Sequence, residues 1–260
     1  MFTYELENAI AHLTIDRPSA YNAIDPDGGR ELCDIVNAMC SDPAVRAVLI
    51  RGTGEKAFCA GGDVGGFAQS GSRLPAEIRE MAGNLHMSIA RLSRMDAPVI
   101  AAVNGVAAGA GLGIVAASDY VLAAEHATFS SAFTAIGLSP DSSTTWYLPR
   151  IVGYRRVMEL LLTNRRLSAA EAHEWGLVNQ VVAAEDFDAE VTSFAERLAA
   201  GPTAAYGAVK RLVRASLADT LETHLEDEAV SLSQMAASAD GMEGVAAFAQ
   251  KRKPEFGGQG

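Results

Sequence analysis

The chain has 260 residues, of which 49% are hydrophobic, so it is long and apolar enough to build a substantial core. Its formal net charge of −11 at pH 7 argues against non-specific nucleic-acid binding, which needs a basic surface. A few local cations can still hold an anionic small molecule, so the acidic composition does not exclude a phosphate-bearing ligand.

We expect a cytoplasmic protein that does not cross a membrane. The N-terminal segment 1–16 lacks a basic region followed by an apolar one, so no signal peptide is expected. The most apolar stretch, 98–117, is about as long as a membrane span, but Asn104 and four glycines interrupt it. Three cysteines without regular spacing favour a reducing compartment. Neither C-x-x-C nor H-E-x-x-H occurs, so no metal site is expected.

Hydrophobic periodicity predicts strands alternating with helices along most of the chain. In chain order the predicted elements are strands within 4–16, a helix over 26–40, a strand over 45–51, a helix over 75–95, a strand over 99–103, a helix over 109–118, a strand over 120–124, helices over 143–150, 154–162 and 168–175, and a strand over 178–182. This alternation predicts an α/β fold with parallel pairing in a buried sheet.

From residue 186 onward the pattern is almost wholly helical. We therefore divide the chain into a core over 1–200, which carries the functional site, and a helical region over 201–260. The glycine-rich tail 257–260 is predicted to be disordered.

Two glycine-rich turns each follow a predicted buried strand. The first spans 56–63 (KAFCAGGD), and the second spans 104–113 (NGVAAGAGLG) and opens a helix. Small residues let a ligand approach the main chain closely, and a helix N-terminus leaves N–H groups unpaired. Two such N–H groups side by side can bind a developing oxyanion, and each donor is worth roughly 10²–10³ in rate.

Two other interpretations of these turns exist. Close packing of a helix on a strand would explain either turn alone. Dinucleotide binding is disfavoured, because 109–113 reads G-x-G-x-G rather than G-x-G-x-x-G and no second βαβ half with a suitable acid follows.

Taken together, the motifs resemble those of the crotonase superfamily, the enoyl-CoA hydratase/isomerase group. The matching segments are DRP at 16–18, YNA at 21–23, both glycine-rich turns, LSAAEA at 167–172, WGLV at 175–178, EGV at 243–245, Phe248, and KR at 251–252. The resemblance covers nearly the whole chain. It implies a spiral of ββα repeats with a C-terminal helical trimerisation region, and homotrimers that often pair into hexamers.

The resemblance also implies an acyl-CoA thioester as the ligand, with coenzyme A as part of the substrate and no other cofactor. It places the two oxyanion-hole N–H groups on Gly62 and Ala110. The implied substrate and CoA-binding positions are Ala23, Lys56, Ala60, Gly62, Asp63, Val64, Ala110, Phe133, Phe248 and Lys251. Phe248 and Lys251 would reach the CoA of a neighbouring subunit, whereas Asp63 is expected to shape its turn rather than to react.

The two catalytic glutamates of the hydratases in this family would fall on Gly113 and Phe133. Neither residue can move a proton, and hydration needs one group to activate water and another to protonate carbon. Hydratase activity is therefore not expected, although the overall similarity would suggest that name.

Asp141, in the segment 136–145 (IGLSPDSSTT), is the acid that remains. The surrounding residues resemble the isomerase branch, including the phenylacetate-pathway ring-opened-CoA isomerases, where an aspartate shuttles the proton. They also resemble the 4-chlorobenzoyl-CoA dehalogenases, where the aspartate is the nucleophile and a histidine matches His86. In that comparison Phe133 replaces a tryptophan and Gly62 replaces a larger aromatic residue. From sequence alone, Asp141 is also typical of a helix N-cap, and His86 of a packed or exposed helix residue.

Three functional hypotheses follow. In the first, Asp141 carries out the 1,3-proton shift of a Δ3-to-Δ2 enoyl-CoA isomerase. In the second, Asp141 is the nucleophile of a 4-chlorobenzoyl-CoA dehalogenase-like hydrolase in which His86 activates water. In the third, the chain is a CoA-ester-binding hydratase homologue with weak or lost catalysis.

Overall fold

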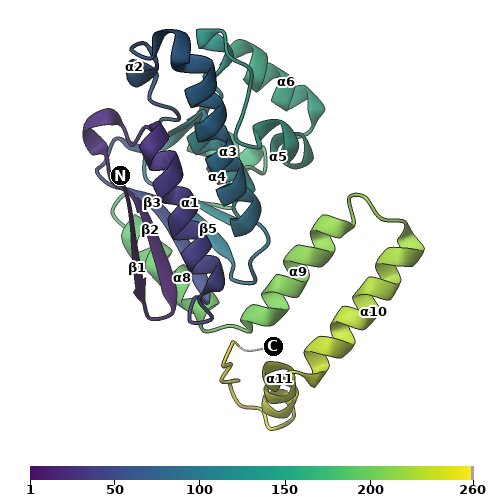
Figure 1. Ribbon diagram of the computed structural model, residues 1–260. Helices are drawn as coiled ribbons and strands as arrows, with labels where there is room; N and C mark the ends of the chain where they lie inside the picture. The colour runs from purple at the N-terminus through teal and green to yellow at the C-terminus, as the bar shows by residue number, and fades with distance from the viewer. Residues whose placement is uncertain (259–260) are drawn as a thin grey trace.

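The computed structural model describes residues 1–258, which are arranged around a six-stranded sheet (Figure 1). The strand order is β1-β2-β3-β5-β7-β10. The bounds are β1 Phe2–Glu7, β2 Ile10–Ile15, β3 Ala47–Gly52, β5 Val99–Val103, β7 Tyr120–Ala124 and β10 Gln180–Val182. β1 and β2 form an antiparallel hairpin, and every later pairing in this sheet is parallel. The predicted α/β class and the parallel pairing are confirmed.

A second, four-stranded sheet has the order β4-β6-β8-β9. Its strands are β4 Ala57–Cys59, β6 Val106–Ala108, β8 Thr128–Ser130 and β9 Leu167–Ser168. β4, β6 and β8 each follow a main-sheet strand and pair in parallel, which produces successive ββα turns. These strands were not predicted, because segments of two or three residues are too short to show a period of two.

Helices cover both faces of the main sheet. α1 (Pro26–Ser41) and α3 (Leu74–Leu92) pack on one face, and α8 (Phe187–Ala199) covers the other (Figure 1). The alternation within β3 explains this, because Val48 and Ile50 point to the first face while Ala47 and Leu49 point to the second. The central strands β3, β5 and β7 are buried on both sides, as expected of a parallel sheet, whereas most residues of the edge strand β1 are exposed.

The remaining core helices lie around the second sheet. Their bounds are α2 Val64–Phe67, α4 Ala110–Ala117, α5 Thr144–Ile151, α6 Tyr154–Thr163 and α7 Ala169–Glu174. The predicted ends of the helices longer than one turn lie within three residues of the observed ends. A capping box fixes the start of α7, because Ser168 accepts from the amide of Glu171 while the Glu171 carboxylate accepts from the amide of Ser168.

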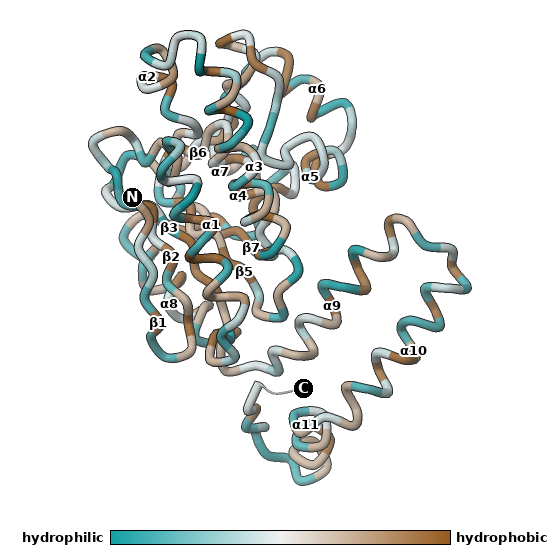
Figure 2. The backbone as a smooth tube through the Cα atoms, in the orientation of Figure 1, coloured by the Kyte–Doolittle hydropathy of each residue, from teal (hydrophilic) through white to brown (hydrophobic). Residues whose placement is uncertain are grey.

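Three further helices extend away from this body: α9 (Thr203–Ala215), α10 (Leu221–Ala237) and α11 (Ala239–Ala249) (Figure 1). The sequence division between 200 and 201 falls in the link between α8 and α9. Lys210 docks α9 by donating to the carbonyls of Leu92 (3.2 Å) and Ala97 (2.9 Å). Hydrophobic segments recur along α9 and α10 outside the core (Figure 2), and no side chain of α10 is buried.

The C-terminal tail is only partly described. The amides of Gly257 and Gly258 donate to the carboxylate of Asp240 at 2.7 and 2.9 Å, so the predicted disorder is wrong for these two residues. The other two residues of that predicted segment, 259–260, lie outside the described part. Within residues 1–258, none of the helices has the length and apolar character needed to cross a bilayer.

Candidate active site

The two glycine-rich turns meet backbone to backbone. Gly61 follows β4 with φ 98°, and Gly109 follows β6 with φ 52°, and both values favour glycine. A Cβ built on Gly61 would lie 3.0 Å from the carbonyl oxygen of Ala108 and 3.3 Å from the amide nitrogen of Ala110. Because β4 and β6 are parallel neighbours, both turns leave the small sheet at the same edge.

The amides of Gly62 and Ala110 lie beside this contact. Ala110 is the first residue of α4, where an N–H has no partner within the helix. Within residues 1–258, neither amide donates a hydrogen bond to a main-chain or side-chain acceptor. Both residues line one cavity of about 290 Å³, which we call the apolar cavity. The positions predicted for the oxyanion-hole donors thus open into the same cavity.

The walls of the apolar cavity are mainly hydrophobic. Its apolar lining consists of Ile24, Val64, Phe67, Ile78, Met81, Ala82, Leu85, Ala110, Phe133, Ile136, Leu138 and Pro140. Asp141 is the one acidic residue that lines it in the described part of the chain, and Ser142 lies next to it. Of the two positions on which the resemblance places the hydratase glutamates, Phe133 lines the cavity and Gly113 does not.

The α3 contribution to this wall was missed from the sequence. Four residues of α3 line the cavity, and the last three follow the first by three, four and seven positions, so all four lie on one face of the helix: Ile78, Met81, Ala82 and Leu85. That stripe was visible as an amphipathic pattern, but the pattern alone does not distinguish a face that packs on the core from one that lines a cavity.

The main chain after Asp141 is unusual. Ser142 and Ser143 both have left-handed conformations, with φ 55° and 63°, which is costly for residues other than glycine. The carbonyl of Asp141 accepts from the amide (3.1 Å) and the hydroxyl (2.7 Å) of Thr144. The N-cap residue of α5 is Ser143, without a side-chain capping bond. The N-cap interpretation of the Asp141 side chain is therefore wrong.

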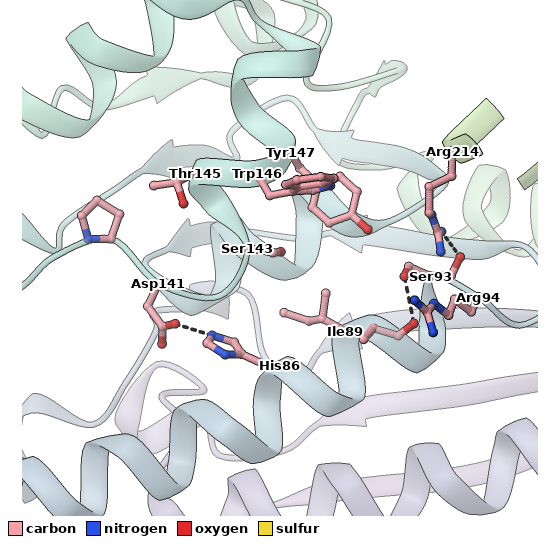
Figure 3. Close-up of a pocket in the computed structure, with 12 residues that line it drawn as sticks. His86, Ile89, Ser93, Arg94, Asp141, Ser143, Thr145, Trp146, Tyr147 and Arg214 are labelled. Atoms are coloured by element: carbon pink, nitrogen blue, oxygen red, sulfur yellow. Dashed lines mark hydrogen bonds and ion pairs between the residues drawn. The ribbon is translucent and has the colours of Figure 1, made fainter. Parts of the chain in front are cut away.

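The carboxylate of Asp141 instead contacts a histidine from a different helix. Oδ1 of Asp141 and Nε2 of His86, on α3, form a hydrogen bond across 55 residues of sequence (Figure 3). The His86 side chain is 51% exposed and the Asp141 side chain 28% exposed. The structure thus brings together Asp141 and His86, for which the sequence also allowed purely structural roles as a helix N-cap and a packed or exposed helix residue.

Four of the predicted CoA-binding positions, Lys56, Ala60, Asp63 and Val64, lie on the first turn or directly after it and are half-buried or exposed, whereas Ala23 is buried. Val64 lies at the apolar cavity and is 47% exposed, and Ala60 is half-buried. Lys56 is exposed and lines a separate hollow of about 460 Å³ together with Tyr21. Val64 and Lys56 thus line two different cavities beside the first turn.

Asp63 is held by groups within the chain. Its carboxylate accepts from the amide of Gly66 at 3.0 Å and from the guanidinium of Arg17 at 2.8 Å. Its amide donates to the carbonyl of Ile24 at 2.8 Å. The Gly66 amide first, and Arg17 second, hold the pKa of Asp63 below its usual value against the opposing effect of partial burial. These contacts fit the expectation that Asp63 shapes the turn that carries Gly62.

Phe248 and Lys251 lie far from the cavity in the same chain. Phe248 is on α11 and 87% exposed, and Lys251 follows this helix. Figure 1 shows α11 at the opposite end of the molecule from α2 and α5. A single chain therefore does not bring these two residues to the site.

Comparison with known proteins shows the family. Residues 5–259 match the family model described as enoyl-CoA hydratase/isomerase. The chain is 40% identical over 256 residues to a Rhodobacter capsulatus protein named "Probable enoyl-CoA hydratase", covering 98% of this chain and 97% of the relative. It is 36% identical over 262 residues to 1,2-epoxyphenylacetyl-CoA isomerase of Escherichia coli, covering 98% and 97%.

Dehalogenases match this chain at a similar level of sequence identity. The chain is 40% identical over 225 residues to 4-chlorobenzoyl coenzyme A dehalogenase-2 of an Arthrobacter species, covering 86% of this chain and 81% of the relative. The crystal structure of an enoyl-CoA hydratase from Polaromonas sp. JS666 superposes with a TM-score of 0.92 at 33% identity, covering 98% and 99%. The chain therefore has the crotonase fold and is an acyl-CoA enzyme that belongs to the enoyl-CoA hydratase/isomerase family.

Proposed function

We propose that this enzyme is a Δ3-to-Δ2 enoyl-CoA isomerase. One observation carries the proposal: a single carboxylate, that of Asp141, lines the cavity into which the amides of Gly62 and Ala110 open. A 1,3-proton shift needs one group that removes and returns a proton, together with stabilisation of an enolate. The site supplies these groups and no second acid in its described lining.

The proposed reaction has two steps. The carboxylate of Asp141 removes a proton from C2 of the ester, and the electrons move onto the thioester oxygen, which the N–H groups of Gly62 and Ala110 stabilise. The protonated Asp141 then donates to C4, and the double bond forms between C2 and C3. One carboxylate suffices because both carbons lie on one face of the ligand. Coenzyme A enters as part of the substrate, and the proton shift uses no further cofactor.

The same site does not support hydration. Hydration adds a water oxygen and a proton to different carbons, so it needs a base for the water and an acid for the carbon. The resemblance places these two groups of the hydratases at positions 113 and 133, which are glycine and phenylalanine here. The name hydratase among the relatives therefore does not fix the reaction of this chain.

One observation favours a second candidate, a dehalogenase-like hydrolase. The carboxylate of Asp141 is hydrogen-bonded to His86, and an imidazole in this place is suited to activating a water molecule beside that carboxylate. In this reaction Asp141 attacks the ring carbon of an aromatic acyl-CoA, the halide leaves, and His86 deprotonates the water that hydrolyses the aryl ester. Glycine at position 62 and phenylalanine at position 133 differ from the aromatic residues implied for that branch, so we place this candidate second.

A panel of CoA esters tests the proposal. We expect wild-type enzyme to convert 3-enoyl-CoA to the conjugated 2-enoyl-CoA, followed by its absorbance, and Asp141→Asn to lose this activity. Asp219→Asn, the same chemical change at an exposed residue between α9 and α10, is the matched control. Isomerase activity that is absent in wild type, or intact in Asp141→Asn, would refute the proposal.

The other esters separate the alternatives. Halide release from 4-chlorobenzoyl-CoA that is lost in His86→Gln would favour the hydrolase. Tight binding of every ester without turnover would favour the third hypothesis, a CoA-ester-binding homologue with weak catalysis. Hydration of 2-enoyl-CoA would show that a group other than the two family glutamates moves the proton.

We also propose that the enzyme works as a homotrimer or a hexamer. The support lies in the C-terminal helices, whose large apolar side chains are exposed in the single chain. These exposed residues include Val209, Val213, Leu221, Leu225, Leu232, Val245 and Phe248. Burying such a surface against other copies of the chain would stabilise the assembly.

A further inference from the structure

Asp141 stands in the wall between two cavities. On one side is the apolar cavity, which holds the amides of Gly62 and Ala110. On the other side is a cavity of about 490 Å³, here called the outer cavity, between α3 and α5 (Figure 3). Pro140 and Asp141 line both cavities, whereas His86 lines only the outer one.

His86 connects Asp141 to the solvent side of this wall. Its Nε2 bonds Oδ1 of Asp141, while its Nδ1 has no hydrogen-bond partner within residues 1–258. Half of the imidazole side chain is exposed, compared with 28% of the Asp141 side chain. The second nitrogen is therefore free to exchange a proton with water.

His86 is also the one side chain of the outer cavity suited to this exchange. The other ionisable residues in its lining are Arg94, Arg214, Tyr147 and Asp141 itself. A guanidinium only donates hydrogen bonds, whereas an imidazole has two ring nitrogens, so one can accept a proton while the other releases one.

We propose that His86 relays the proton between Asp141 and solvent. This inference rests on the proposed isomerase function. When His86 is the tautomer that carries its hydrogen on Nδ1, Nε2 is an acceptor: after Asp141 has taken the C2 proton, its O–H bond breaks and an N–H bond forms at Nε2 of His86. The imidazolium then loses the proton on Nδ1 to water. The reverse sequence delivers a solvent proton to Asp141 and from there to C4, so atoms and charge balance over the cycle.

The relay predicts where the proton at C4 comes from. If Asp141 alone carried the proton, the hydrogen removed from C2 would return to C4 of the same molecule. With the relay, a solvent hydrogen replaces the C2 hydrogen on Asp141 during the lifetime of the enolate in the oxyanion site. The hydrogen at C4 therefore comes by one of two paths, direct return of the C2 hydrogen or exchange with solvent. A variant that only misplaces Asp141 slows both paths and changes their ratio little.

The test is isomerisation of 3-enoyl-CoA in D₂O by wild type, His86→Gln and Met87→Gln, quenched early. The product is analysed by mass spectrometry, and by NMR for the deuterium at C4. Glutamine at 86 keeps a hydrogen-bond donor for Asp141 but cannot relay a proton. Met87 is the neighbouring residue, 47% exposed, and lines neither cavity, which makes it the matched control.

We expect deuterium at C4 in wild type and Met87→Gln. In His86→Gln the deuterium per turnover should fall by about tenfold or more, because a positioned proton-transfer group contributes at least that much to its step. The isomerisation rate should fall less. Wild-type product without deuterium, or equal deuterium in wild type and His86→Gln, would overturn the relay.

The same samples separate this inference from the proposed function. If wild type does not isomerise the ester, deuterium at C2 of the recovered substrate is measured instead. Exchange at C2 that is lost in His86→Gln would support the relay without isomerase activity. An ester that is neither isomerised nor exchanged would contradict both proposals.

Discussion

Gly113 packs directly against Ser142, the residue that follows Asp141. A Cβ built on Gly113 would lie 2.6 Å from the Cβ of Ser142 and 3.0 Å from its carbonyl carbon, and closer still to the carbonyl oxygen. Ser142 is fully buried and has φ 55°, so it has little freedom to move away. A side chain at 113 and Asp141 in its present position therefore exclude each other. In this chain, a side chain at the position on which the resemblance places a hydratase glutamate would thus conflict with the loop that carries Asp141.

The first prediction concerns that exclusion. Gly113→Glu should not create hydratase activity, because the new side chain displaces the Asp141 loop rather than entering the cavity. Gly113→Ala should already lower the isomerase rate, by about 100-fold if the carboxylate moves by 1 Å. Rates with 3-enoyl-CoA and with 2-enoyl-CoA measure the two activities.

A matched control for Gly113→Ala exists on α3. A Cβ added at Gly83 would meet nothing within 4 Å, so Gly83→Ala should leave the rate unchanged and stabilise the helix by about 1 kcal/mol. Full isomerase activity in Gly113→Ala, or hydration by Gly113→Glu, would show that the loop tolerates a side chain at 113.

The second prediction isolates one N–H group of the oxyanion site. Ala110 is the first residue of α4, a position at which proline fits the helix because its missing N–H has no helical partner. Ala110→Pro should therefore lower kcat by about 10²–10³, the usual cost of one oxyanion donor. Ala110→Gly keeps the N–H and should retain most of the activity. Equal rates for the two variants would remove Ala110 from the proposed mechanism.

The glycine-rich turns could be predicted because their chemistry is local. The strands of the main sheet have clear β-branched runs, and glycines such as Gly61 and Gly109 mark positions where the backbone turns sharply. From these features the sequence predicts that two sets of free amides follow neighbouring strands. The contact between the turns then follows from parallel pairing.

The partner of Asp141 could not be predicted in this way. His86 lies 55 residues earlier on α3, and its pairing depends on how α3 and the loop before α5 pack. The left-handed conformations of Ser142 and Ser143 depend on the same packing, since serine does not favour them by itself. Hydrophobic periodicity predicts which face of a helix is buried, but it does not predict which loop packs against that face.

The third prediction concerns pH. Asp63 has a pKa held below its ordinary 3.8, chiefly by the Gly66 amide and then by Arg17. A carboxyl with a depressed pKa contributes stability that is present above its unfolded value and is lost as the pH falls through the folded value. Asp63→Asn should lower the free energy of unfolding at pH 7 by about 1–2 kcal/mol, since a hydrogen bond to a charged group is weakened.

Chemical denaturation at several pH values checks this expectation. Wild type should lose more stability than Asp63→Asn between about pH 5 and pH 3, because the variant lacks the titrating group. Asp27→Asn is the control, as the Asp27 side chain is 88% exposed. Parallel curves for wild type and Asp63→Asn would mean that the contacts of the Asp63 carboxylate with the Gly66 amide and Arg17 contribute nothing to the stability of the folded state.

The fourth prediction concerns Lys251, which lies beyond α11 and far from the cavity of its own chain. If it reaches the CoA of a neighbouring subunit, Lys251→Ala should raise KM by about threefold, the range of an exposed ion pair, and leave kcat unchanged. Lys253→Ala, two residues further along the exposed tail, is the control. Light scattering should give a mass of three or six times 27.3 kDa for each variant.

Mixed assemblies show whether the effect of Lys251 acts between chains. Co-expressed Asp141→Asn and Lys251→Ala chains should form some sites in which an intact Asp141 faces an intact Lys251 from another copy. These sites should have the wild-type KM, which Lys251→Ala alone does not show, and they should be active, which Asp141→Asn alone is not. A mixture that shows only the KM of Lys251→Ala would place the role of Lys251 within its own chain, and a monomeric mass would exclude a shared site altogether.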